Sequence, residues 1–238
     1  MLKKKLKRNS YKPVKLIIVM QFKLSPHTIS LMQECPRCFW LTQHKIWQRP
    51  EGITASLMNG MDRILKTHFD KFRDKGELPP ELQNNGDCNN LMLFDDPELL
   101  EVWRNYRKGI VWEDENGNIL MGAVDNVLVN TKNNKLIILD YKTRGFPLKE
   151  NTHEYYQNQL DIYNFLLRKN NYETEDYAFL LFYIPKEVLP TGVVLFDTTL
   201  KKVKINILNA EYLFNKAIKL LNSQCPEERC KWCENVEY

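Results

Sequence analysis

The chain has 238 residues, of which 43% are hydrophobic and 27% are charged. This length and composition indicate a globular protein of one ordinary domain, or of one domain with a small appendage. They exclude a disordered chain, a fibrous repeat and a multi-domain motor. The sequence has no glycine-rich phosphate loop ending in Gly-Lys-Ser or Gly-Lys-Thr and only nine glycines, which argues against an ATPase engine and a dinucleotide-binding fold.

Positive charge is concentrated at the start of the chain. Residues 1–23 carry eight basic side chains and no acidic one, whereas the remainder carries 26 basic and 30 acidic side chains. We interpret residues 1–23 as a basic N-terminal arm and residues 24–238 as a single domain. The arm is either a solvated tail or a segment that follows nucleic-acid phosphates. In the second case the candidate phosphate contacts are Lys3, Lys4 and Lys5.

Membrane and export signals are weak. The apolar run at 16–20 is five residues long, which is too short for a signal peptide or a membrane span. We therefore expect a cytoplasmic protein with no membrane partner.

Helical patterns come first along the chain. Ser25-Pro26 combines an N-cap with a proline at the first helical position, which predicts a helix that reaches Cys35. A second helix is predicted over 57–73, with Asp62 at the surface. The apolar face expected for it consists of Met61, Leu65, His68 and Phe72.

The segment at 76–95 is polar and rich in proline and asparagine, which predicts a loop. Asp96-Pro97 then predicts a third helix that ends at Gly109, with Trp103 and Tyr106 facing inward.

The pattern changes to short runs rich in β-branched and aromatic residues at 110–113, 119–129 and 136–141. Asn-Gly and Asn-Asn turns separate these runs, so they predict an antiparallel three-stranded meander. The elements expected after it are a helix at 153–169, a doubly buried strand at 177–184, edge strands within 193–207 and a final helix capped by Asn209. This order predicts an α/β (α+β) fold with a mixed central sheet flanked by helices.

Two aspartates and a lysine are expected to meet at a strand end. Asp140 and Lys142 project together because alternate residues of a strand share a face. Pairing of two neighbouring predicted strands brings Asp125 alongside Asp140. Adjacent carboxylates repel unless a cation lies between them, and their oxygens suit Mg²⁺ or Mn²⁺. Such an ion polarises a phosphoryl oxygen, while a lysine stabilises developing charge. A simple ion pair of Lys142 with one aspartate is the alternative.

These residues belong to an ordered series of motifs. Gly122-Ala123-Val124-Asp125 is followed by Asp140-Tyr141-Lys142, and Gln159 then precedes Tyr163 by one helical turn. The order resembles the PD-(D/E)XK nuclease superfamily. It is most similar to the RecB-like exonuclease branch, which includes the AddB nuclease domain and the CRISPR-associated RecB-type nucleases.

The resemblance implies a restriction-endonuclease-like core and a metal-dependent deoxyribonuclease that hydrolyses phosphodiester bonds. It further implies an exonuclease that acts on single-stranded or end-containing DNA in repair, recombination or defence. The residues to which it assigns catalysis are Asp125, Asp140, Lys142, Gln159 and Tyr163. The metal ligands that it implies are Asp125, Asp140 and the Tyr141 carbonyl. Arg144 is a candidate phosphate contact.

One feature departs from that branch. Its members often carry a histidine four residues after a glycine on the first core helix, but here Gly60 is followed by Ile64 at that position. His68 lies one turn later and is the substitute metal ligand to consider. The departure leaves open a nuclease fold that has lost efficient catalysis and acts as a DNA-binding or assembly module. An enzyme that acts on RNA is a further alternative.

Six cysteines in a cytoplasmic chain indicate metal ligands more than disulfides. Cys35 with Cys38, and Cys230 with Cys233, form two C-x-x-C pairs that can close one tetrathiolate site for Zn²⁺ or for an iron–sulfur cluster, and their spacing fits zinc better. The resemblance implies a 4Fe–4S iron–sulfur cluster held by Cys35, Cys230, Cys233 and Cys225. The fourth ligand is therefore either Cys38 or Cys225, and free buried thiols remain the alternative. A metal site here would staple the two ends of the domain together.

Overall fold

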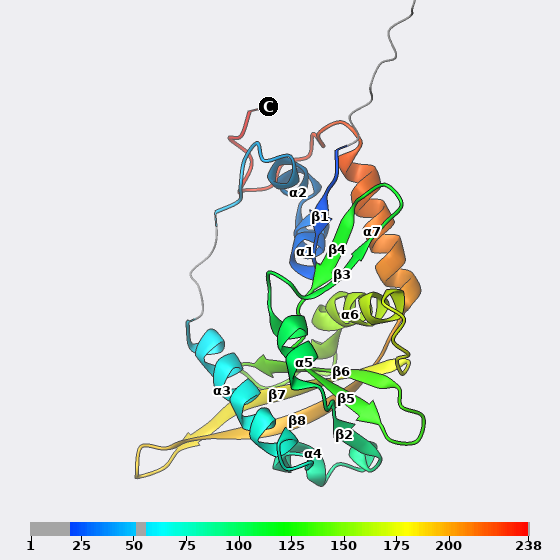
Figure 1. Ribbon diagram of the computed structural model, residues 1–238. Coiled ribbons are helices and arrows are strands. Elements are labelled where there is room, and N and C mark those ends of the chain that lie inside the picture. Colours follow the sequence, from blue (N-terminus) through cyan, green and yellow to red (C-terminus); the bar gives the residue numbers. More distant parts are fainter. Residues whose placement is uncertain (1–19, 51–55, 238) are drawn as a thin grey trace, which may run out of the picture.

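The structure is a computed structural model that describes residues 20–50 and 56–237 (Figure 1). The helices are α1 (Pro26–Glu34), α2 (Pro36–Gln43), α3 (Ser56–Arg73), α4 (Pro80–Gln83), α5 (Pro97–Arg104), α6 (Gln157–Lys169) and α7 (Ile207–Leu221). The strands are β1 (Lys23–Leu24), β2 (Leu91–Leu93), β3 (Ile110–Glu113), β4 (Ile119–Gly122), β5 (Asn126–Asn130), β6 (Leu136–Thr143), β7 (Tyr177–Val188) and β8 (Val194–Lys204). Short 3₁₀ turns lie at Gly86–Cys88 and Thr152–Tyr156. Lys3, Lys4 and Lys5 of the predicted arm lie outside the described residues.

The strands of the described chain form two sheets. The larger has the order β2-β5-β6-β7-β8, in which β6 and β7 are parallel and the other neighbours are antiparallel. The smaller has the order β1-β4-β3, with β1 parallel to β4. The large sheet is thus mixed and flanked by helices, which confirms the predicted fold class.

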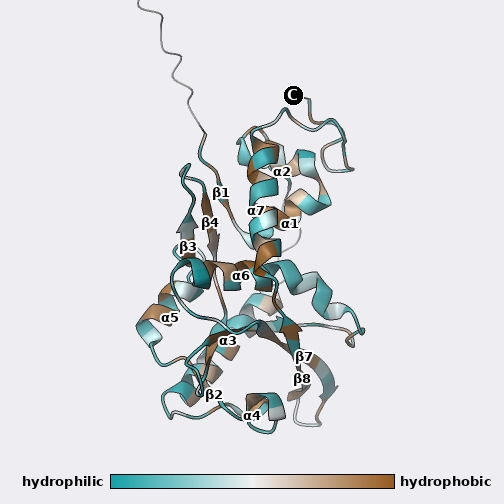
Figure 2. Ribbon diagram, turned by 90° about the vertical axis from the view of Figure 1, so that its right-hand side faces the viewer, coloured by the Kyte–Doolittle hydropathy of each residue, from teal (hydrophilic) through white to brown (hydrophobic). Residues whose placement is uncertain are grey.

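The central strands β6 and β7 are buried on both faces. Ile138 and Leu180 pack into a hydrophobic cluster together with residues of α6 and α7. Leu139 and Phe179 point the other way, into a second cluster with residues of α3 and α4. Figure 2 shows this distribution, with strong hydrophobic colour on the central strands and polar colour on the outer faces of the helices. A sheet covered on both sides holds its strand ends rigidly, which matters for the site described below.

The predicted strand over 119–129 is interrupted. Its first part, β4, ends at Gly122 in the small sheet, and its second part, β5, begins at Asn126 in the large sheet. The pairings of β3 with β4 and of β5 with β6 are antiparallel, as the meander predicts, but they lie in different sheets. The sequence is apolar up to Val124 and again from Val127, and the two polar residues between them do not by themselves reveal a change of sheet. The interruption puts Asp125 at the start of a strand.

Two helix ends differ from the sequence pattern. The final helix is capped by Asn206, and Asn209 lies in its first turn, where its amide donates to Asp161 at 2.8 Å. α5 ends at Arg104, so Tyr106 lies beyond the helix and is 73% exposed instead of facing inward. The cap lies three residues before the predicted Asn209, and α5 ends five residues before the predicted Gly109.

The predicted loop at 76–95 contains regular structure. α4, a 3₁₀ turn and β2 lie within it, and β2 forms an edge of the large sheet. On α3, the buried face includes Phe69 and Arg73, whereas His68 is turned partly toward solvent. None of the helices in the described ranges is long and apolar enough to cross a membrane.

Candidate functional site

Three of the predicted site residues converge at one end of the large sheet. Asp140 and Lys142 lie two residues apart on β6, so they share a face and form an ion pair. Asp125 directly precedes β5, and its Oδ2 accepts the Tyr141 backbone N–H at 2.9 Å. The backbone ladder between β5 and β6 begins at Asn126. One residue earlier, the Asp125 side chain takes the place of the backbone as the hydrogen-bond partner of β6.

The glutamine–tyrosine motif connects to the same point. Lys142 donates from Nζ to Oε1 of Gln159 at 2.9 Å, and Gln159 donates from Nε2 to the hydroxyl of Tyr163 at 2.8 Å. Both residues lie on α6, one turn apart. Gly122 makes this approach possible, because a Cβ there would come within 2.7 Å of the Tyr163 ring. The motifs of the sequence therefore form one contiguous cluster.

A second lysine reaches the cluster from α3. The ammonium of Lys66 lies 2.8 Å from a carboxylate oxygen of Asp62 and 3.3 Å from Oδ1 of Asp125. The predicted surface residue Asp62 is thus part of the acidic cluster, although its side chain is 43% exposed. The sequence analysis singles out no role for Lys66. Its spacing of four residues from Asp62 is the signal that could have indicated the pair.

Two other predicted residues have different surroundings. The ring of His68 lies about 3.1 Å from the carboxylate of Glu81 and packs edge-on against Phe69 and Phe72. The structure thus brings His68 to Glu81 and not to the aspartate pair. Arg144 directly follows β6, where its backbone N–H donates to the Tyr183 carbonyl at 3.0 Å. Its buried Nε has no hydrogen-bond partner among the described residues.

The charges at this sheet end are strongly perturbed. Burial raises the pKa of Asp140 to about 7; Lys142 opposes this shift and Asp125 adds to it. Burial also raises the pKa of Asp125, against the opposing effect of Lys66 and Lys142. Burial disfavours the charge of Lys142, but Asp140 and Asp125 outweigh it and raise the pKa of Lys142.

The buried Oδ2 of Asp140 contacts the Lys142 ammonium as an ion pair, without the geometry of a directed hydrogen bond. Asp125 raises the pKa of Asp140 further, so the two carboxylates repel each other. A divalent cation between two such carboxylates offsets this repulsion. Oxygen donors of this kind suit Mg²⁺ or Mn²⁺. The residues present therefore fit such an ion.

Two arginines with buried side chains form hydrogen bonds to the chain segment that carries Asp125. Arg104 on α5 donates from Nε to the Asp125 carbonyl at 2.8 Å. Arg73 on α3 donates to Oδ1 of Asn126 at 2.8 Å, and Asn126 donates to the Tyr141 hydroxyl at 2.6 Å. These bonds fix the chain where it crosses between the sheets. The sequence analysis missed them, because the two arginines come from separate helices and follow no motif spacing.

The cysteine site lies at the other end of the molecule, where the C-terminal segment runs beside α2 (Figure 1). The sulfurs of Cys35, Cys38, Cys230 and Cys233 all lie within 4.8 Å of one another. The separations are 3.5 Å for Cys38–Cys230, 3.8 Å for Cys230–Cys233 and 3.9 Å for Cys35–Cys233. A tetrahedral ion with metal–sulfur bonds of about 2.3 Å holds its sulfurs about 3.8 Å apart.

The four sulfurs therefore fit a single tetrahedral ion. A 4Fe–4S cluster needs a wider cage, because its irons and sulfides lie between the ligand sulfurs. Burial raises the pKa of Cys35 and Cys38. At Cys230 burial opposes the thiolate, but the backbone N–H groups of Trp232 and Cys233 outweigh it and lower the pKa to about 6.

Cys225 lies outside this group. Its sulfur accepts from the guanidinium of Arg37 at 3.3 Å. Arg37 is buried and also donates to the carbonyls of Pro226 at 2.8 Å and Val236 at 3.1 Å. Arg37 thus ties the C-terminal segment to α2 independently of any metal. Arg37 belongs to no recognised motif spacing, so the sequence pattern points to the cysteines alone.

A buried aspartate, a partly buried aspartate, a lysine and a glutamine–tyrosine pair thus meet at the end of a mixed sheet, an arrangement that fits metal-dependent nuclease chemistry. A family model described as the PD-(D/E)XK nuclease superfamily matches residues 23–237, and the chain belongs to this superfamily. A comparison with curated proteins found no match. A solved structure titled "Crystal structure of SSO0001" is 13% identical, with a TM-score of 0.41, over 87% of this chain and 81% of that one.

Proposed function

We propose that this protein is a metal-dependent DNA nuclease, of the RecB-like type, that hydrolyses phosphodiester bonds. The observation that carries the proposal is the buried Asp140 beside Asp125, with the Lys142 ammonium in contact with Asp140 and the pKa of both carboxyl groups raised. An ion pair of Lys142 with Asp140 alone does not account for the second carboxylate beside it. Membership of the nuclease superfamily supports the same chemistry.

Asp125 and Asp140, with the Tyr141 carbonyl, are the residues that would hold Mg²⁺ or Mn²⁺. When bound, such an ion supplies polarisation of a phosphoryl oxygen and activation of a water molecule. Lys142 adds a positive charge where negative charge develops on the phosphate. Gln159 accepts from Lys142 and thereby orients its ammonium, and Tyr163 in turn fixes Gln159.

The proposed substrate class and the proposed exonuclease action both rest on the order of the motifs. Their resemblance to the RecB-like branch supports an exonuclease that acts on single-stranded or end-containing DNA in repair, recombination or defence. Arg144 follows Lys142 by two residues at the same strand end, which supports a phosphate contact there. Lys3, Lys4 and Lys5 are proposed to add further phosphate contacts.

The test is cleavage by the purified protein with Mg²⁺ or Mn²⁺. Linear single strands, linear duplexes and covalently closed single-stranded circles are compared, because an exonuclease degrades only strands with an end. We expect degradation of the linear single strand, no loss of the circle, and no activity with EDTA or in Lys142→Ala. Cleavage that persists without a divalent ion would overturn the proposal. RNA of the same sequence tests the polymer preference in the same assay.

A non-catalytic DNA-binding module is the second candidate. It is favoured by Ile64 in place of the expected histidine and by Lys66, whose ammonium occupies space between Asp62 and Asp125. This candidate predicts DNA binding without metal-dependent cleavage, whereas the nuclease predicts both.

For the cysteines, we propose one Zn²⁺ bound by Cys35, Cys38, Cys230 and Cys233. The short sulfur separations support a single ion over a 4Fe–4S cluster. Elemental analysis of protein purified without oxygen is expected to give one zinc per chain and no absorption near 400 nm in the visible range, where iron–sulfur clusters absorb. Iron with inorganic sulfide would contradict it.

A further inference from the structure

Two exposed aromatic side chains are each paired with an arginine. Tyr106 is 73% exposed, and the guanidinium of Arg107 lies 5.3 Å from its ring centre while its Nε donates to the Tyr106 hydroxyl at 2.9 Å. Trp232 is 41% exposed, and the guanidinium of Arg49 lies 5.1 Å from its ring centre. Arg49 is held there by Glu34 at 2.6 Å. Exposed aromatic rings are platforms on which nucleic-acid bases stack, and nearby arginines add cation–π contacts and positive charge.

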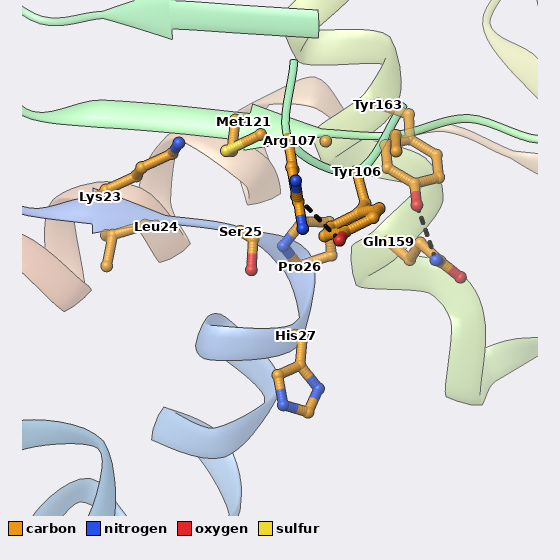
Figure 3. Close-up of a pocket in the computed structure, with 12 residues that line it drawn as sticks. Lys23, Leu24, Ser25, Pro26, His27, Tyr106, Arg107, Met121, Gln159 and Tyr163 are labelled. Atoms are coloured by element: carbon orange, nitrogen blue, oxygen red, sulfur yellow. Dashed lines mark hydrogen bonds between the residues drawn. The ribbon is translucent and has the colours of Figure 1, made fainter. Parts of the chain in front are cut away.

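The first pair borders the candidate active site. Tyr106 and Arg107 line a cavity of about 590 Å³, and Gln159 and Tyr163 form part of its wall (Figure 3). Gln159 accepts a hydrogen bond from Lys142, which is paired with Asp140. The Lys142 side chain therefore connects this cavity to the aspartate pair. Its lining includes basic residues such as Lys23 and no acidic one. Its volume and its charge suit a nucleotide with its phosphate.

The second pair lies in the cysteine region and shares a boundary with the first. Trp232 and Arg49 line a cavity of about 610 Å³. His27, at the start of α1, lines both cavities. The two cavities therefore meet at His27, with Gln159 and Tyr106 in the first and Trp232 in the second. Trp232 stands between Cys230 and Cys233, so a metal on these cysteines also fixes the position of its ring.

We propose that this surface is a track for single-stranded nucleic acid. One base of the strand that leaves the aspartate pair stacks on Tyr106, and a base further along stacks on Trp232. The cysteine site is then part of the substrate-binding surface in addition to being a staple. This inference rests on the proposed nuclease function for the direction of the strand, but the stacking contacts are testable without cleavage.

Tyr212 on α7 is a matched control. It is 59% exposed and has the ammonium of Lys216 5.8 Å from its ring centre, but it lines neither cavity. Tyr212 therefore matches Tyr106 and Trp232 in having an exposed ring near a cation, and it differs from them in lying outside the two cavities.

The experiment measures binding of a fluorescent single-stranded DNA of about 20 nucleotides by anisotropy, in an Asp140→Asn background that prevents cleavage. A strand of the same length with abasic sites throughout keeps the phosphates and removes the bases. We expect Tyr106→Ala and Trp232→Ala each to weaken binding of the normal strand about tenfold and to leave the abasic strand unchanged. Tyr212→Ala should change neither. Equal losses on both strands, or no loss on the normal strand, would overturn the proposal.

Strand length and ring-preserving variants sharpen the test. On a strand of about four nucleotides that reaches Tyr106 only, Trp232→Ala should lose its effect while Tyr106→Ala keeps it. Tyr106→Phe and Trp232→Phe should retain most of the affinity, and zinc content and Tm check that each variant is folded. Equal weakening by Trp232→Phe and Trp232→Ala would contradict stacking on that ring.

Failure of this proposal is distinguishable from failure of the nuclease. Metal-dependent cleavage by the wild-type protein together with unaltered binding in the aromatic variants overturns the track alone. Base-dependent binding without any cleavage overturns the enzyme and leaves the track in place.

Discussion

The carboxylate site and the cysteine site are built in opposite ways. Asp125, Asp140 and Lys142 lie at the ends of neighbouring strands in a sheet that is covered on both faces. The cysteine site joins positions almost two hundred residues apart, since Cys35 and Cys233 are separated by 198. One of its halves belongs to a C-terminal segment without helix or strand, which follows the end of α7 at Leu221.

This difference assigns different tasks to the two ions. The sheet and the Arg104 and Arg73 contacts hold the carboxylates in place without an ion, at the cost of mutual repulsion. A metal there would relieve this repulsion and supply the proposed chemistry. The C-terminal segment has no helix or strand to fix it and is attached to α2 through Arg37, Trp40 and the sulfurs, so an ion there would contribute to the free energy of folding. The account therefore predicts that activity and stability respond to different substitutions.

The largest effect is expected from the carboxylate site. Asp140→Asn should lower metal-dependent cleavage by about 10³-fold or more, because the buried ligand and its charge are lost. The Tm of the metal-free variant should be unchanged or higher, since a buried amide costs less than a buried carboxylate. Cleavage rates and thermal melts of the same preparations check both. Asp87→Asn, which alters an exposed carboxylate, is the control. A folded Asp140→Asn protein that cleaves at the wild-type rate would remove Asp140 from the mechanism.

The second substitution is expected to lower stability while largely preserving activity, the reverse of the change at Asp140. Cys38→Ser should release the bound zinc and destabilise the fold by about 3 kcal/mol, or about 10 °C in Tm, because the closure of a very long loop is lost. Cleavage per folded molecule should change much less.

Cys225→Ser and Cys88→Ser are matched controls for that substitution, since both cysteines lie outside the four-sulfur group. Neither should lose zinc. Retention of zinc and of Tm in Cys38→Ser would favour plain buried thiols, and loss of zinc in Cys225→Ser would restore Cys225 as a ligand.

A smaller effect tests the electrostatics of the carboxylate site. Lys66→Gln removes the ammonium between Asp62 and Asp125, so the affinity for Mn²⁺ should rise about tenfold. Calorimetric titration with Mn²⁺ measures the change. Lys71→Gln, an exposed position on the same helix, should leave the affinity unaltered. A weaker affinity in Lys66→Gln would instead make Lys66 a residue that positions Asp125.

The smallest effect concerns the basic arm. Deleting residues 1–15 removes seven positive charges and no negative one. If the arm contacts phosphates, DNA affinity falls and the slope of log affinity against log salt flattens by up to about 0.7 per charge. Binding isotherms at several salt concentrations give the slope. An identical slope with and without the arm would identify it as a solvated tail.

The sequence predicts the parts of the carboxylate site that one strand or one helix presents. Asp140 with Lys142 and Gln159 with Tyr163 are each fixed by the local repeat of their element, so their shared faces are predictable. The doubly buried β7 and the Ser25 cap follow from composition and capping patterns in the same way.

Features that depend on tertiary contacts were not predictable. The crossing between the sheets at residues 123–125 lies within one run of strand-forming residues, and it is fixed by Arg104 from α5. Tyr106 has the spacing of an inward helical residue, but α5 ends before it and the ring becomes exposed. Among the cysteines, spacing favours Cys38 as the fourth ligand and the family resemblance implies Cys225, and the sulfur distances separate them.

The central claim is that a divalent ion binds between Asp125 and Asp140 while a different ion occupies the four cysteines. Anomalous diffraction from a crystal soaked in Mn²⁺, recorded at the manganese and zinc edges, tests both halves at once. The account predicts a manganese peak within bonding distance of both carboxylates and the Tyr141 carbonyl, and a separate zinc peak at the centre of the four sulfurs. Saturating Mn²⁺ with no peak between Asp125 and Asp140 would contradict it.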